Sequence, residues 1–172
     1  MMKIARSHWA LAIGVAAVTS GTDLGFARSQ GVSAPSTDTV TSHSGGSMGV
    51  ELAPGVRFEV VELRRLPDKG VMQLRFAVVN QSGGDTSLKD HGLAFNQELR
   101  DIAVIDFAGG KKYSIGYAAS CLCSTFKDRD GGTVRAGDRR EFWAWFGMPP
   151  AGVRQMAVQI PNQQPLMNIP LL

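Results

Sequence analysis

The only two cysteines of the chain, Cys121 and Cys123, lie two residues apart. In an extended strand, residues i and i+2 face the same side, so both thiols would point in one direction. Their Cα atoms would lie about 6.5 Å apart in a flat strand, near the upper limit for a disulfide, so closure needs a local bend. In an oxidising compartment we expect the pair to form a small disulfide that stiffens a loop.

A sharper hypothesis gives the same cysteine pair a redox or metal-binding role. Two thiolates that face one way suit soft ions such as Cu(I) or Zn(II). A tetrahedral zinc site needs two further ligands, however, and neither His43 nor His91 lies at ligand spacing from the cysteines. We therefore expect no resident metal and no cofactor. A thiol-based redox or copper- or zinc-handling envelope protein is the alternative function.

Two tryptophans form the other unusual feature. Trp143 and Trp145 share one face of the segment 139–146, and the side chains of the opposite face are apolar as well. Either the strand is covered on both sides, or an aromatic strip is exposed as a contact surface for a protein or a glycan. We expect burial under Tyr117, Phe126 or the segment 87–99, because aromatic side chains are usually well buried.

The sequence contains no recognisable catalytic constellation, so we expect a protein that is not an enzyme. Asp90 and His91 are adjacent, but no nucleophile elbow or other triad context accompanies them. The formal net charge is only +3, and the basic residues are scattered along the chain. Nucleic-acid binding usually requires a basic stripe on one face, so no nucleic-acid partner is expected.

Residues 1–27 have the pattern of a secretory signal peptide. Lys3 and Arg6 precede an uncharged apolar run at 9–18, and a small and polar stretch leads to Ala27. The apolar run is shorter than the roughly 20 residues that a transmembrane helix needs, so no stable membrane insertion is expected after cleavage. The sequence therefore predicts a secreted or periplasmic protein.

Two regions follow the predicted signal peptide. Residues 28–50 are rich in Ser, Thr, Gly and Pro and have almost no large apolar side chain, which predicts a disordered, flexible linker. From residue 51 the sequence changes to short apolar runs separated by turn residues. Strict alternation at 72–78 predicts a half-buried strand. The segment 87–99 is the exception, since it predicts a short helix or an irregular crossing.

Further strands are expected at 56–60, 101–107, 111–117, 139–146, 153–160 and 166–172. Turn signals every 8–15 residues or so favour an antiparallel arrangement. The sequence thus predicts an all-β domain over residues 51–172. We expect an immunoglobulin-like antiparallel β-sandwich of about seven or eight strands.

Several short motifs follow one another in a recognisable order. They are Val-Val-Asn at 78–80, a hairpin at 106–113, Cys-Leu-Cys-Ser at 121–124, Ala-Gly-Asp at 136–138 and Val-Gln-Ile-Pro at 158–161. The order resembles the immunoglobulin-like extracellular domains of exported and surface-anchored bacterial proteins, especially actinobacterial ones. The resemblance implies fold and location, and such domains share no common activity. We expect a non-enzymatic module that acts in binding or structural support in the cell envelope or outside the cell.

Overall fold

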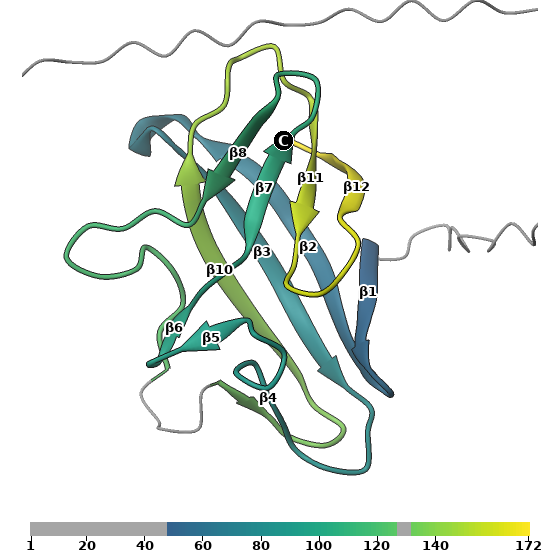
Figure 1. The fold of residues 1–172 in the computed structure, drawn as a ribbon. Coiled ribbons are helices and arrows are strands. Elements are labelled where there is room, and N and C mark those ends of the chain that lie inside the picture. Colours follow the sequence, from purple (N-terminus) through teal and green to yellow (C-terminus); the bar gives the residue numbers. More distant parts are fainter. Residues whose placement is uncertain (1–47, 127–131) are drawn as a thin grey trace, which may run out of the picture. The chain divides into compact units, whose positions relative to one another are not determined.

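The structure, a computed structural model, describes residues 48–126 and 132–172 and is all-β over these residues (Figure 1). The predicted signal peptide, residues 1–27, and most of the predicted linker lie outside the described residues. Strand β1 (Met48–Ala53) begins slightly ahead of the predicted domain boundary, because Val50 and Leu52 pack against the core. No helix in the described part of the chain is long and apolar enough to cross a membrane.

The first sheet contains four antiparallel strands in the order β1-β2-β3-β10. Strand β2 (Val56–Leu66) and strand β3 (Val71–Asn80) form a hairpin, and strand β10 (Arg139–Gly147) pairs with the other side of β3. A short 3₁₀ turn, Pro67–Lys69, joins β2 to β3. Gly70 ends this turn with φ 65°, a left-handed conformation that glycine adopts without steric cost.

The second sheet contains four antiparallel strands in the order β12-β11-β7-β8. Its strands are β7 (Ala103–Asp106), β8 (Lys111–Ser114), β11 (Gln155–Gln159) and β12 (Leu166–Pro170). Two pairs of two-residue strands complete the described fold. They are β4 (Thr86–Ser87) with β9 (Thr133–Val134), and β5 (Ala94–Phe95) with β6 (Glu98–Leu99).

One hydrophobic core joins the inward faces of the two main sheets. Phe76 of β3 stacks on Phe58 of β2, with ring centroids 4.6 Å apart, and on Phe142 of β10 at 5.4 Å. Val104 of β7 and Val158 of β11 belong to the same buried cluster. The predicted all-β, antiparallel fold is therefore confirmed.

The segment 87–99, for which the sequence predicts a short helix or an irregular crossing, contains no helix and crosses irregularly through turns and short strands; Asn96 and Gln97 make the β5–β6 turn with φ 47° and 71°. The strand order differs from that of an immunoglobulin constant domain, in which the second and third strands lie in opposite sheets. Here residues 67–70 alone connect β2 to β3, and so short a connection makes the two strands antiparallel neighbours in one sheet.

Candidate functional site

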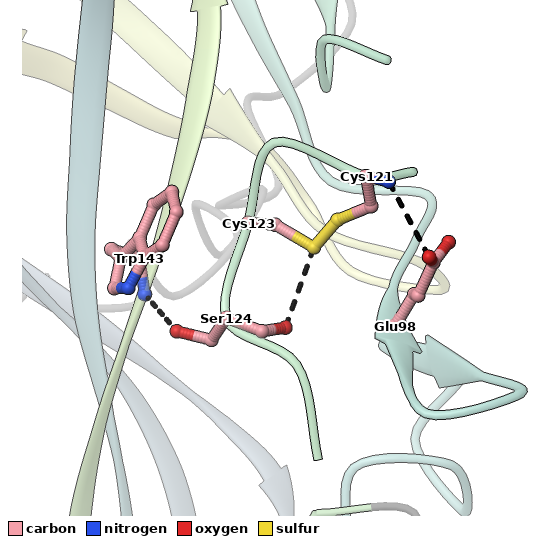
Figure 2. Close-up of a disulfide and its surroundings, with 5 residues drawn as sticks. All are labelled: Glu98, Cys121, Cys123, Ser124 and Trp143. Carbon is pink, nitrogen blue, oxygen red and sulfur yellow. Dashed lines mark hydrogen bonds between the residues drawn. A yellow bond between two sulfur atoms is a disulfide. The ribbon is translucent and has the colours of Figure 1, made fainter. Parts of the chain in front are cut away.

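Cys121 and Cys123 form a disulfide in the segment that follows β8 (Figure 2). Their Cα atoms lie 5.3 Å apart, closer than in a flat strand, so the chain bends between them as closure requires. Both side chains are buried, with exposed fractions of 5% and 4%. The predicted disulfide is therefore confirmed.

Backbone hydrogen bonds hold this segment against the outer edge of β10. The N–H of Gly116 donates to the carbonyl of Trp145, and the N–H of Trp145 donates to the carbonyl of Leu122, both at 2.8 Å. The N–H of Ser124 donates to the carbonyl of Trp143 at 2.8 Å, and the N–H of Trp143 donates to the Ser124 hydroxyl at 2.9 Å. Residues 116–124, which we call the disulfide segment, thus cover a strand edge that would otherwise present unpaired backbone groups.

Two polar groups lie next to the disulfide. The N–H of Cys121 donates to Oε1 of Glu98 at 3.4 Å (Figure 2). The Sγ atom of Cys123 lies 3.4 Å from the carbonyl oxygen of Ser124. A disulfide sulfur carries no hydrogen, so this contact becomes a hydrogen bond only after reduction to the thiol. Glu98 therefore satisfies the N–H of Cys121, and the burial of both cysteines leaves little room for an external reactant at the sulfurs.

Trp143 and Trp145 lie on the outer face of the first sheet, because the alternating side chains of β10, such as Phe142 and Phe146, fill the core. Trp143 is 36% exposed and Trp145 is half-buried, so the expected burial of both side chains is wrong. Their ring centroids are 5.4 Å apart with an interplanar angle of 46°. The ammonium of Lys69 lies 4.6 Å from the centroid of the Trp145 ring, within range of a cation–π contact.

Polar side chains of neighbouring strands flank the two tryptophans. The β3–β10 register places Arg75 opposite Trp143 and Gln73 opposite Trp145. The guanidinium of Arg64, on β2, donates to Oε1 of Gln73 at 3.0 and 3.2 Å. We call the surface formed by Gln73, Arg75, Glu141, Trp143 and Trp145 the tryptophan face.

The charges of the tryptophan face are paired with one another. Arg75 lies 2.7 Å from the carboxylate of Glu141 and 3.6 Å from that of Glu62. Arg139 also bonds Glu141, at 2.6 Å. Hydrogen bonds from Arg139 and Arg75 lower the pKa of the Glu141 carboxyl, which keeps it ionised at neutral pH. The face therefore combines exposed aromatic surface with a compensated ion network.

The histidines contribute no catalytic arrangement to the described region. Nε2 of His91 lies 2.8 Å from Oγ1 of Thr86, and partial burial lowers the pKa of this histidine. The structure does not bring His91 together with Cys121 or Cys123 in any described contact. His43 lies outside the described residues.

Sequence reasoning missed a cavity of about 590 Å³ beside the second sheet. Arg100, Lys112, Ser114, Tyr117 and Gln159 are among its lining residues. They come from three separate stretches of the chain, so no local motif marks the cavity. The alternation of polar and apolar residues at 112–115 was the only available signal, and it indicates an exposed strand face without indicating a hollow.

No family model matches the chain, and neither a curated protein nor a solved structure matches it. A proposal for its function therefore rests on the chain's own residues and geometry.

Proposed function

We propose that this protein is an exported, non-enzymatic module that acts in binding or structural support, in the cell envelope or outside the cell. Its partner, a glycan or a protein, contacts the tryptophan face. The observation that carries the proposal is the exposure of Trp143 beside Trp145 on the outer face of the first sheet. The signal-peptide pattern of residues 1–27 and the resemblance to extracellular domains support the location.

Tryptophan on a strand face offers a partner a large, rigid apolar area. Such side chains are enriched at protein interfaces and dominate their binding energy. The surrounding charges already have partners, since Arg75 is bonded to Glu141 and Arg64 to Gln73. An uncharged, hydroxyl-rich or polar partner can therefore dock without leaving a buried charge unpaired.

A thiol-based redox or metal-handling function remains the alternative hypothesis. Burial of Cys121 and Cys123 argues against it, because reactive cysteines are generally accessible to solvent. The intact mass of the mature protein, with and without reduction before alkylation, separates the two hypotheses. Alkylation only after strong reduction supports a structural disulfide, whereas alkylation without any reductant supports the alternative. The same mass spectrum tests cleavage after Ala27.

Co-sedimentation of the mature protein with insoluble polysaccharides tests the tryptophan face. Cellulose, chitin and peptidoglycan serve as probes, and we expect the wild-type protein to sediment with at least one of them. Trp143→Ala should weaken this binding by about 30-fold or more, as truncation of an interface hot spot does. Phe107→Ala is the matched control, because Phe107 is a 57% exposed aromatic residue in the β7–β8 turn. Equal sedimentation of the wild type and Trp143→Ala would exclude this face as the glycan contact.

A further inference from the structure

Small side chains leave a hollow in the outer face of the second sheet. The strand register places Ala103 of β7 between Ser114 of β8 and Gln159 of β11. Val104 and Val158 face the core, so Ala103 and Gln159 face outward by alternation. Because Ala103 and Ser114 are short, they do not fill the space between longer neighbours. The resulting cavity, which we call the Tyr117 pocket, has a volume of about 590 Å³, within the range of small-molecule sites.

The lining of the Tyr117 pocket includes an aromatic ring and three charged groups. Tyr117 is 61% exposed, and Arg100, Asp101 and Lys112 also line the cavity. Arg100 forms an ion pair with Asp101 at 3.4 Å. Lys112 has no ion-pair partner among the described residues. The lining of the pocket therefore carries an excess of positive charge, and this charge belongs to Lys112.

The disulfide segment holds Tyr117 at the edge of this pocket. Tyr117 and Cys121 form an antiparallel bridge, and the N–H of Ala118 donates to the carbonyl of Ser120 at 3.0 Å within the same turn. The Cys121–Cys123 disulfide fixes one side of that turn. The loop that carries Tyr117 is therefore ordered before a ligand stacks on the ring. Less conformational entropy is lost on binding as a result.

We propose that the Tyr117 pocket binds a sugar acid, that is, a hydroxylated ring with a single carboxylate. One uncompensated cation matches a carboxylate better than a phosphate monoester, which carries about −1.5 to −2 at neutral pH. Ser114 and Gln159 offer hydroxyl and amide groups to the ligand's hydroxyls, and Tyr117 offers a flat apolar surface to its ring. A purely apolar acid would leave the polar lining unpaired. This site is separate from the tryptophan face and does not depend on it.

Isothermal titration calorimetry of the mature protein with galacturonate, a sugar acid with one carboxylate, tests the proposal. The methyl ester of the same sugar removes the charge and keeps the hydroxylated ring. We expect the acid to bind at least about tenfold more tightly than the ester, and Lys112→Gln to lose about tenfold in affinity. Lys111→Gln is the matched control. Its side chain alternates to the other side of β8, 5.2 Å from the Tyr113 ring centroid, so we expect less than about a twofold change.

Tyr117→Leu should also weaken binding, and circular dichroism shows whether each variant remains folded. Equal affinity for acid and ester, or equal losses in Lys111→Gln and Lys112→Gln, would overturn the proposal. Acetate or inorganic phosphate that binds as tightly as galacturonate would overturn the choice of a sugar acid, and so would no measurable binding at millimolar galacturonate. Trp143→Ala should leave the titration unchanged, so a failure of this site is distinguishable from a failure of the tryptophan face.

Discussion

The disulfide closes a ring that spans only Cys121, Leu122 and Cys123, and its stabilising effect can be worked out from that loop. In the chain-entropy description, a disulfide lowers the entropy of the unfolded chain by an amount that grows with loop length. For a loop of about three residues, the entropy change is about 5.4 cal/mol/K, or about 1.6 kcal/mol at 25 °C. A loop of about 100 residues would give about 4.7 kcal/mol. We therefore expect reduction to lower the free energy of unfolding by about 1.6 kcal/mol.

The folded segment should survive reduction, because its backbone contacts to β10 do not involve the sulfurs. The hydrogen bonds made by Leu122 and Ser124 remain available to the reduced chain. Equilibrium urea unfolding, followed by circular dichroism, compares the oxidised protein with the reduced protein and with the double variant Cys121→Ala/Cys123→Ala. The midpoint should fall while the urea dependence of the free energy changes little. A loss above about 4 kcal/mol, or an unfolded reduced protein, would refute a contribution limited to loop closure.

Three further predictions concern stability, and urea unfolding measures all of them. Asn80 is fully buried, and its side-chain amide donates to two backbone carbonyls at 2.9 Å. Asn80→Ala should therefore lower the free energy of unfolding by about 2–4 kcal/mol, and a loss below about 1 kcal/mol would contradict a structural role for these bonds. Burial lowers the pKa of His91 from 6.5, so the unfolded state binds its proton more readily. Stability should therefore fall as the pH drops below about 6.5, and His91→Gln should flatten that dependence. Gly55 has φ 76°, and a Cβ there would lie 3.0 Å from the backbone nitrogen of Ser82. Gly55→Ala should thus cost about 1–3 kcal/mol, more than Gly70→Ala, where a Cβ meets open space.

Strands with long alternating patterns were predictable from the sequence. The apolar residues at 72–78 alternate strictly. They lie in β3, and Met72, Leu74, Phe76 and Val78 face the core. Strands β4, β5, β6 and β9 have two residues each, too few for a period of two to appear. The hairpin turn at Asn96 and Gln97 also lacks the Asn-Gly signature that marks such turns.

The candidate site was predictable only in part. The spacing of Cys121 and Cys123 predicted the disulfide, because two cysteines on one face are expected to oxidise in an oxidising compartment. The environment of Trp143 was not predictable, since both faces of β10 are apolar and the packing of distant segments decides which face is covered. The Tyr117 pocket depends on the strand register that sets Ala103 beside Ser114, which no local pattern reveals.

Hydroxyl-radical footprinting of the purified mature protein and of intact producing cells tests the tryptophan face most directly. Trp9 lies in the predicted signal peptide, so Trp143 and Trp145 are the tryptophans of the mature chain. We expect Trp143 to be oxidised in the purified protein and protected in cells, where a partner occupies the face. Phe107, exposed in the β7–β8 turn, should react equally in both samples. Equal oxidation of Trp143 in cells and in the purified protein would contradict a partner on this face.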